Sequence, residues 1–247
     1  MPFSKGDMVL VDYSVFVKET GELIETTSEE VAKKHNKYDP RAFYEPALII
    51  IGEGRALPAF EEAVAEAEVG EEREVEIPPE KAYGERKEEY VKVFTIKQLR
   101  RALGEEKVRE LSVGDEVAFG DTVGRVISIT GGRVTIDFNH PLAGKTLILR
   151  FKVVKKLEDV EEKIRYLAAR RFRVPAKDLV ASYNEETKTA AVEIPRKLLA
   201  SEDLGYRIVF VAGDIIKWVK EVEKVAISSL FTRDDFEPEK REEGESE

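Results

Sequence analysis

The chain has few residues of the types that carry out acid–base, nucleophilic or metal chemistry. Among its 247 residues there is no cysteine, and His35 and His140 are the only histidines. Without thiols, a disulfide framework, a thiolate zinc site and a cysteine nucleophile are excluded, and two histidines are too few for a multi-histidine metal site. We therefore expect a site without metal or cofactor.

Tyr83 is the residue with the clearest chemical signal. It stands in the sequence Ala-Tyr-Gly within a turn-rich segment, and a tyrosine in a tight glycine turn often directs its hydroxyl at a partner. By local sequence alone, a functional and a structural role for Tyr83 are equally supported. Local sequence alone also predicts that Tyr13 and Leu57 are core residues and that Glu25 is a solvated carboxylate on a strand. It predicts that His140 is a loop residue without acid–base chemistry.

These residues lie on short strands, one helix and the loops between them. Runs of β-branched and aromatic residues are typical of strands. Leu57, Phe60, Val64 and Ala67 recur at helical spacing, and Pro58 is acceptable in the first turn of a helix. The sequence predicts strands at 8–17, 23–27, 47–51 and 73–77, with the helix between the last two.

The rest of the chain predicts two further structured regions and a polar end. Gly131 and Gly132 separate two alternating segments, and paired glycines are a strong hairpin signal because both central residues of a type I′ turn need positive φ. The acidic segment after Thr232 has the composition of a disordered tail. We expect strands at 90–94, 123–130, 133–138, 146–154, 180–183, 189–194 and 225–231, and helices at 96–103, from 160 onward and at 213–222.

Composition limits the class of protein. The formal net charge of -10 argues against a nucleic-acid binder, because phosphate contacts need clustered Lys and Arg. No apolar run reaches the ~20 residues that span a bilayer, and residues 1–7 lack the apolar region of a signal peptide. We expect a soluble, cytoplasmic protein without a membrane partner. A charged fraction of 36%, with no cysteine and two methionines, resembles the composition of proteins from thermophiles.

Five short motifs occur in a specific order and spacing. They are VDY at 11–13, GELIETT at 21–27, IGEGRALPAFE at 51–61, VGE at 69–71 and PEKAYG at 79–84. Each is weak alone, but the ordered set resembles the FKBP family of peptidyl-prolyl cis/trans isomerases. A β-rich segment then precedes NHPLAG at 139–144, which looks like the return motif of the SlyD-like branch, and the extension beyond 156 resembles that of its long archaeal members.

The resemblance implies an α+β fold, with an FKBP-like antiparallel sheet wrapped on a short helix, an inserted β-rich domain and an α+β C-terminal domain. The nickel-binding tail of some SlyD proteins is rich in His and Cys, and this chain's tail has neither, so metal binding is not expected. The implied domains are a discontinuous isomerase domain at 1–86 and 139–156, an insert-in-flap chaperone domain at 87–138, the C-terminal domain at 157–231 and the disordered tail at 232–247.

The resemblance also assigns residues to a prolyl pocket, in which Tyr13 lines the wall and Phe60 forms the floor. Tyr83 would donate its hydroxyl to the substrate, and a backbone N–H of the loop before the helix would bind the substrate carbonyl. Some family members have larger residues at three pocket positions, so the pocket implied here is apolar but shallower. The implied catalytic set is Tyr13, Glu25, Leu57, Phe60 and Tyr83, and the implied pocket-lining set is Ile24, Ala47, Ala56, Leu142 and Leu149.

Such a pocket needs no nucleophile. Rotation of an X–Pro bond breaks no bond but passes through a twisted amide, over a barrier of ~18–20 kcal/mol. The twisted amide is less polarised than the planar one, so an apolar, water-poor pocket favours the transition state over the ground state. A hydrogen bond to the prolyl carbonyl holds the substrate in position.

The inserted domain would bind unfolded chains through exposed apolar side chains, with Val93, Phe94 and Phe119 as the implied contacts. We therefore expect an isomerase with chaperone activity, whose partners are unfolded or proline-containing polypeptides. The alternative is a holdase chaperone with little or no isomerase activity. A nucleic-acid-associated factor would use the basic runs 97–101 and 170–173, but these are short and lie in an acidic chain, which favours solvated helix faces.

The helix predicted at 213–222 has more apolar surface than one packing face requires. Ile215 and Ile216 are adjacent and so point about 100° apart. A domain of roughly 75 residues has little interior to supply two packing surfaces. Two arrangements account for this surplus: a homodimer with Trp218 at or near its interface, or a helix that lies between its own sheet and the isomerase domain.

Overall fold

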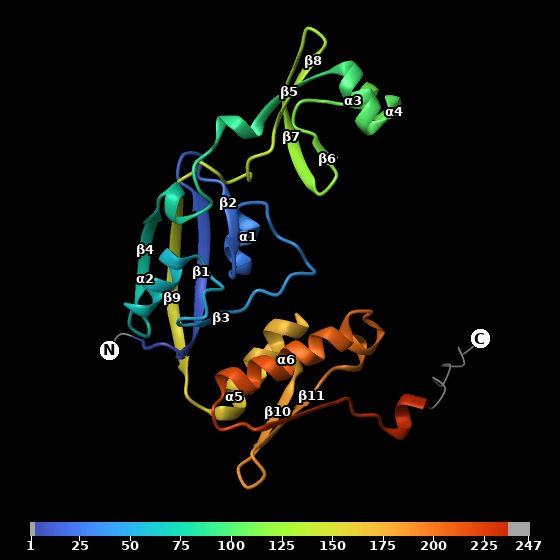
Figure 1. Cartoon of the computed structure of the whole chain (residues 1–247). Helices are drawn as coiled ribbons and strands as arrows, with labels where there is room; N and C mark the ends of the chain where they lie inside the picture. The colour runs from blue at the N-terminus through green and yellow to red at the C-terminus, as the bar shows by residue number, and fades with distance from the viewer. Residues whose placement is uncertain (1–2, 237–247) are drawn as a thin grey trace, which may run out of the picture.

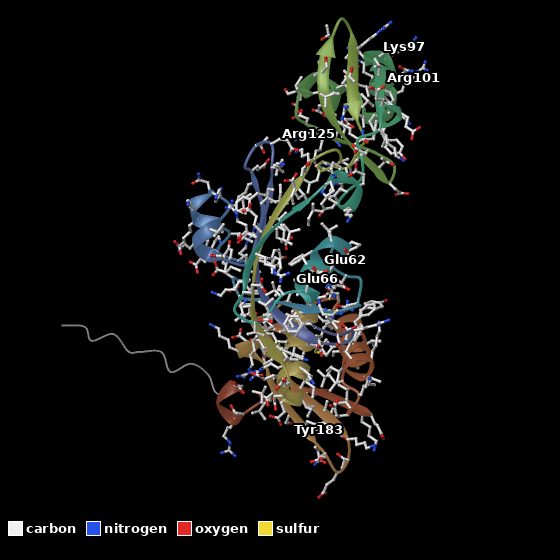
Figure 2. The ribbon with its side chains drawn as sticks, turned by 90° about the vertical axis from the view of Figure 1, so that its left-hand side faces the viewer. Glu62, Glu66, Lys97, Arg101, Arg125 and Tyr183 are labelled. Carbon is white, nitrogen blue, oxygen red and sulfur yellow. The ribbon has the colours of Figure 1, made fainter. Side chains whose placement is uncertain are left out.

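The computed structural model describes residues 3–236 and divides their strands among three sheets (Figure 1). The sheets have five, four and three strands. The five-stranded sheet lies in the middle of an elongated molecule, with the four-stranded sheet at one end and the three-stranded sheet at the other (Figures 1 and 2). The predicted α+β fold is confirmed.

The five-stranded sheet is antiparallel and is built around two long strands. It consists of β1 (Met8–Val17), β2 (Leu23–Thr26), β3 (Ala47–Ile50), β4 (Glu72–Ile77) and β9 (Leu147–Leu157). β1 and β9 pair along their whole length, from Met8 opposite Leu157 to Val17 opposite Leu147. Because β9 follows the insert in the chain, this central sheet is completed by residues from both sides of the insert.

Two short helices border the central sheet. α2 (Pro58–Ala65) covers one face and buries Phe60 and Val64, which confirms the helix predicted from the apolar spacing. Pro58 occupies the start of α2, where a missing N–H leaves no hydrogen bond unmade. α1 (Glu29–Lys34) lies in the long segment after β2 and is capped by the hydroxyl of Ser28.

The insert forms a separate body with a core of its own. Gly131 and Gly132 adopt φ of 58° and 73° between two antiparallel strands, so the predicted hairpin is confirmed. The sequence did not predict α4, whose six residues include Val108 as the only buried one. The elements are η2 (Glu88–Tyr90), β5 (Val91–Thr95), α3 (Ile96–Leu103), α4 (Glu105–Glu110), β6 (Glu116–Phe119), β7 (Thr122–Thr130) and β8 (Arg133–Asp137). The core residues are Leu99, Val108, Val117, Val126, Val134 and Ile136.

The C-terminal unit places two helices on a small sheet. The hairpin predicted at 180–194 is confirmed, and β12 lies parallel to β11, with α6 as the connection between them. The elements are α5 (Val160–Phe172), η3 (Ala176–Asp178), β10 (Val180–Asn184), β11 (Thr189–Glu193), η4 (Arg196–Ala200), α6 (Leu204–Trp218), β12 (Lys224–Ser228) and η5 (Arg233–Phe236).

The bounds predicted for the last helix were wrong. The sequence placed it at 213–222, whereas α6 begins at Leu204 and ends at Trp218. Glycine is a poor helix former, at about 1 kcal/mol less favourable than alanine, which is why Gly213 looked like a boundary. In the folded chain Val211 and Ile215 are fully buried on either side of it, and this packing carries the helix through the glycine.

The C-terminal unit and the central sheet share one apolar core. Met8 and Leu10 of β1, and Leu48 and Ile50 of β3, belong to the same buried cluster as residues of α5, α6 and the three-stranded sheet. Figure 1 shows the two helices lying between the small sheet and the end of the central sheet. The helix pair therefore packs on two sides, as one of the two predicted arrangements requires.

The end of the chain is described only in part. Residues 237–247 of the predicted disordered tail lie outside the described residues. The first part of that tail differs from the prediction, because Arg233–Phe236 forms η5 and Asp235 makes an ion pair with Arg196. Across residues 3–236, no helix combines the length and the apolar character needed to cross a bilayer.

Candidate active site

A cavity of about 850 Å³ opens between the central sheet, α2 and α5. Its walls come from distant parts of the sequence: the strands β1 to β3 with the segment before β3, the loop and helix at 53–61, and the end of α5. Tyr83, Leu142 and Leu147 complete the lining. The predicted pocket residues that the structure brings together around it are Tyr13, Ile24, Glu25, Ala47, Ala56, Leu57, Phe60, Tyr83 and Leu142.

Tyr13 and Phe60 form the aromatic wall of this cavity. Their rings meet edge to face, with centroids 5.1 Å apart, and Phe60 packs in turn against Phe151 of β9 at 6.0 Å. The Tyr13 hydroxyl donates a hydrogen bond of 2.6 Å to the Glu25 carboxylate. Burial and the neighbouring charge of Glu25 raise the pKa of Tyr13 well above its ordinary value. Tyr13 is therefore a neutral residue in the wall of the cavity, and its hydroxyl proton is already hydrogen-bonded to Glu25.

The loop before α2 carries a backbone donor at Leu57, a residue that lines the cavity. Within residues 3–236 the N–H of Leu57 makes no hydrogen bond, whereas its carbonyl accepts from Phe60 and Glu61. The Glu61 carboxylate holds the loop from behind by accepting from Gly52 at 2.6 Å and Gly54 at 3.0 Å. Both glycines have positive φ, which side-chain-bearing residues rarely adopt. The loop is thus fixed with its N–H available to a substrate carbonyl.

Tyr83 also lines this cavity. Its ring lies flat on His140, with centroids 4.3 Å apart and planes 3° apart. His140 is held by the N–H of Leu142, which donates to its Nδ1, and Gly144 bonds the carbonyl of Gly84 at 2.8 Å. Among the described residues no group hydrogen-bonds the Tyr83 hydroxyl. The sequence assigned His140 no role, but it supports the position of Tyr83.

The other predicted site residues lie away from this cavity. Leu149 is 1% exposed and belongs to the core under the sheet, so it contributes packing and does not line the cavity. Phe94 and Phe119 stack at 5.2 Å and are partly buried against the core of the insert, whereas Val93 is 58% exposed. The apolar contacts predicted on the insert are therefore in a separate body, and two of the three belong to its own packing.

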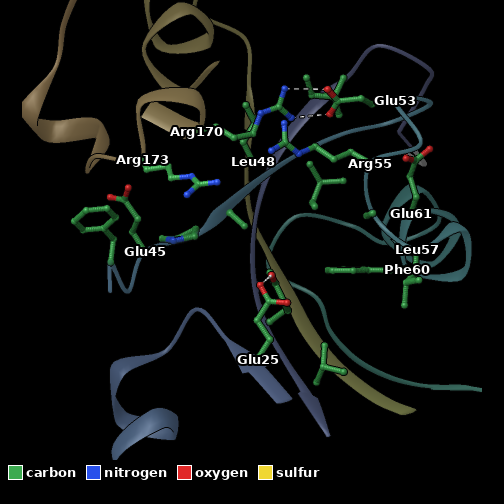
Figure 3. A pocket seen from close by; sticks show the side chains of 18 of the residues that line it. Glu25, Glu45, Leu48, Glu53, Arg55, Leu57, Phe60, Glu61, Arg170 and Arg173 are labelled. Atoms are coloured by element: carbon green, nitrogen blue, oxygen red, sulfur yellow. Dashed lines mark hydrogen bonds and ion pairs between the residues drawn. The ribbon is translucent and has the colours of Figure 1, made fainter. Parts of the chain in front are cut away.

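The C-terminal unit supplies one wall of the cavity, which the sequence did not reveal. The Arg170 guanidinium bonds both oxygens of Glu53, at 2.6 and 2.9 Å (Figure 3). It also bonds Asp214 at 3.2 Å. Arg171 bonds Asp214 at 2.6 and 3.0 Å, and Phe172 is fully buried. The run at 170–173 is therefore largely part of an interface between domains and not a solvated helix face. The other run fits the expectation, since Lys97 and Arg101 point outward from the insert (Figure 2).

Comparisons with known proteins agree with this architecture part by part. Residues 2–99 match the family described as FKBP-type peptidyl-prolyl cis-trans isomerase. Residues 111–142 match the family "FKBP26, IF domain", and residues 160–231 match "FKBP26 C-terminal". The first match runs past the isomerase sheet, because β5 and α3 lie within it but belong to the insert.

Similar whole proteins point the same way. The short-type peptidyl-prolyl cis-trans isomerase of Methanocaldococcus jannaschii is 42% identical over 149 residues, which cover 60% of this chain and 90% of that protein. The FKBP-type peptidyl-prolyl cis-trans isomerase SlyD of Helicobacter pylori is 37% identical over 121 residues, covering 49% of this chain and 64% of the relative. The chain therefore belongs to the FKBP-type peptidyl-prolyl cis-trans isomerases, as a SlyD-like enzyme with a chaperone-associated insert-in-flap domain and an FKBP26 C-terminal domain.

Proposed function

We propose that the X–Pro bond of an unfolded or partly folded protein rotates at the aromatic end of the cavity. One observation carries this assignment: a free backbone N–H at Leu57 and a free hydroxyl at Tyr83 both border the apolar floor formed by Phe60. The prolyl ring packs on Phe60 and the prolyl carbonyl accepts from Leu57. The Tyr83 hydroxyl then bonds the peptide on the other side of the rotating bond.

These groups act by holding one half of the amide while the other half turns. Fixing the carbonyl places the substrate in a geometry close to the twisted state, which removes part of the entropic barrier. The apolar wall of Tyr13 and Phe60 keeps water from stabilising the planar, polarised amide. Glu25 keeps the Tyr13 ring in place through its 2.6 Å hydrogen bond. Ile24, Ala47, Ala56 and Leu142 complete the lining, and Leu149 supports it from the core.

A prolyl-peptide assay on single variants tests this assignment. Tyr83→Phe removes one hydrogen bond and should lower kcat/KM by about threefold to tenfold, as expected for a bond worth roughly 1 kcal/mol. Phe60→Ala removes the floor and should lower kcat/KM further. Tyr90→Phe is the matched control, because Tyr90 is an exposed tyrosine at the base of the insert and does not line the cavity. Unchanged rates in both cavity variants would refute the site.

The chaperone activity requires a surface that takes up unfolded chains, and we assign it to the insert. Val93, Val113 and Val123 are 58%, 63% and 55% exposed on this body. Exposed apolar residues on a small domain are typical of a surface that binds other chains. The holdase alternative differs in one measurement: a chain without isomerase activity would suppress aggregation but would not accelerate the refolding of a protein limited by proline isomerisation.

The domain boundaries also remain proposals. We place the isomerase domain at 1–86 and 139–156, the insert at 87–138, the C-terminal domain at 157–231 and the tail at 232–247. The separate core of the insert and the end of β9 at Leu157 support these limits.

We also propose that the chain is cytoplasmic and comes from a thermophilic archaeon. The lack of cysteine and the charged fraction of 36% support the thermophilic origin. A thermal melt that ends below about 60 °C, within the mesophile range, would argue against the thermophilic origin.

We further propose that two copies of the chain associate through α6. Its outer face is an apolar stripe at helical spacing, made of Tyr206, Val209, Phe210 and Ile216, with exposed fractions of 75%, 68%, 56% and 49%. A twofold dimer places the same patch of both copies against itself, and a continuous helical stripe is suited to this. Trp218, which the sequence predicts at or near the interface, is partly buried against the shared core at the end of the same helix.

Light scattering of the full chain decides between a monomer and this dimer. Phe210→Glu places a charge in the centre of the stripe and should shift a dimer to monomers. Val180→Glu is the matched control, because Val180 is 62% exposed on β10 and lies outside the stripe. A monomeric parent chain would refute the proposal.

A further inference from the structure

The cavity extends beyond the aromatic site toward the C-terminal unit. Arg55, from the loop before α2, and Arg173, the residue after α5, both line this second end. In Figure 3 their guanidinium groups point toward one another across the hollow. Since Tyr13 and Phe60 line the same cavity, one peptide chain can reach both ends.

Two carboxylates at the cationic end of the cavity, Glu53 and Asp214, already accept hydrogen bonds from other arginines and not from Arg55 or Arg173. Glu53 is engaged by Arg170 through both oxygens, and Asp214 is engaged by Arg170 and Arg171. The Glu45 carboxylate also lies near Arg173 (Figure 3), so four guanidiniums stand against three carboxylates at this end. The remaining carboxylates of the cavity have other partners: Glu25 accepts from Tyr13, Glu45 from the N–H of Ala176, and Glu61 from Gly52 and Gly54.

The guanidinium groups of Arg55 and Arg173 make no hydrogen bond or ion pair within residues 3–236. Burial, followed by the charges of Arg170 and Arg171, lowers the pKa of Arg55, and the carboxylates of Glu53 and Asp214 offset this only in part. The local potential is therefore positive. An anion bound between the two free guanidiniums would supply the charge and the acceptors that the protein itself does not provide.

The backbone at Arg173 adds an independent observation. Arg173 follows α5 with φ 56°, a left-handed conformation. Glycine is usual at this position of a helix end because a side chain there is strained. Strained residues of this kind cluster at functional sites. The strain is consistent with a need for the guanidinium at this point of the cavity wall.

We propose that Arg55 and Arg173 bind the side-chain carboxylate of an Asp or Glu close to the proline of the client chain. Arginine suits this ligand because its planar donors match the two oxygens of a carboxylate. The C-terminal unit is then a part of the isomerase site that selects acidic proline-containing segments. This inference rests on the proposed position of the prolyl site.

Kinetics with matched peptides test the subsite on the full chain. The peptides share one prolyl sequence and differ at a single position, two or three residues before or after the proline, which holds Glu, Gln or Lys. At one of these positions the Glu peptide should exceed the Gln peptide in kcat/KM by about threefold to tenfold, the range of a partly exposed charged hydrogen bond, with Lys lowest. The preference should shrink as salt screens the charges.

Two variants and one control locate the effect. Arg55→Gln and Arg173→Asn should bring the Glu-to-Gln ratio close to one, and asparagine tolerates the left-handed backbone at 173. Arg165→Gln keeps the ratio, because Arg165 lies on α5 outside the cavity and pairs with Glu162. Equal rates for Glu, Gln and Lys peptides in the parent chain would overturn the subsite and leave the isomerase site intact. Variants that slow Glu and Gln peptides by the same factor would also overturn it. A parent chain inactive on every peptide would instead refute the prolyl site.

Discussion

The insert and the C-terminal unit attach to the central sheet in opposite ways. Two segments of the chain connect the insert to the central sheet, yet the core of the insert contains only residues of the insert. One crossing at the end of β9 joins the C-terminal unit, yet its core is continuous with β1 and β3. The number of covalent connections therefore does not determine how strongly two domains depend on each other. The apolar surface that two domains bury against each other determines how strongly they depend on each other.

The polar contacts repeat this difference. At the base of the insert, Arg86 bonds Asp137 at 2.8 Å, and their side chains are 45% and 15% exposed. At the C-terminal interface, Arg170 and Glu53 are each 12% exposed. Water competes for the first pair far more than for the second. The insert should thus behave as a hinged module, and the C-terminal unit as a wall of the isomerase domain.

Removal of each unit should give the largest contrast. Replacing residues 88–138 with a short Gly/Ser loop should leave a folded isomerase that still accelerates prolyl peptides but loses most of its effect on refolding proteins. Truncation after Leu157 should destabilise the central sheet, because it exposes Met8, Leu10, Leu48 and Ile50, each worth about 1.5–3 kcal/mol of burial. Circular dichroism melts and the two activity assays measure this. If the truncated chain melts like the parent, or the loop variant keeps full chaperone activity, the comparison fails.

Substitutions that create a cavity in one of the two cores should destabilise different parts of the molecule. Phe172→Ala removes a fully buried ring from the shared core and should cost about 3–5 kcal/mol in the unfolding of the sheet and the C-terminal unit together. Leu99→Ala removes an equally buried side chain from the insert and should cost about 2–5 kcal/mol in the unfolding of the insert alone. Urea unfolding followed by hydrogen exchange separates the two units. Isomerase-sheet amides that exchange faster in Leu99→Ala than in Phe172→Ala would contradict the assignment of the two cores.

Breaking the interdomain ion pairs should have a smaller effect that reaches the active site. Arg170→Ala leaves the Glu53 carboxylate partly buried without its partner, which should cost about 1–3 kcal/mol of stability. Since Glu53 belongs to the loop that carries the Leu57 N–H, kcat/KM for prolyl peptides should also fall. Arg165→Ala, which removes a more exposed guanidinium from the same helix, serves as the control. An Arg170→Ala enzyme with parental kinetics would show that the loop does not depend on the C-terminal unit.

Lowering the pH should change the stability of the fold least among these tests. The change should arise both at the C-terminal interface and at the base of the insert. Burial would raise the pKa of Asp214, but the hydrogen bonds and charges of Arg171 and Arg170 outweigh it and lower the pKa. At the hinge, burial likewise opposes the bonds from Asn139 and Arg86, which lower the pKa of Asp137. Each carboxylate thus stabilises the fold above its unfolded pKa of about 3.9, and this stabilisation is lost as the pH falls through the lower folded value.

Substitution by the amide isolates each of these contributions. Asp214→Asn should reduce the loss of stability of the sheet and C-terminal unit between pH 5 and about pH 2. Asp137→Asn should reduce only that of the insert. Thermal melts across this pH range provide the measurement. Acid sensitivity that survives unchanged in both variants would show that other carboxylates control it.

Most of the pocket residues that the sequence by itself predicted line the candidate site. Tyr13, Leu57, Phe60 and Tyr83 lie in short motifs whose local signals survive folding: a strand, a proline at the start of a helix and a glycine turn. The hairpin at Gly131 was equally local, because only the turn requires its positive φ. These features depend on neighbours within a few residues, which a pattern in the sequence records directly.

Only the tertiary structure decided which surfaces meet. Arg170 and Glu53 are 117 positions apart, and neither residue type nor spacing distinguishes their contact from solvent exposure. The same holds for the stack of Tyr83 on His140 and for the burial of Leu149 under the sheet. Helix α6 continues through Gly213 because packing against α5 outweighs local propensity. Long-range contacts form where apolar faces fit together, and that fit depends on the shapes of both domains rather than on any local pattern.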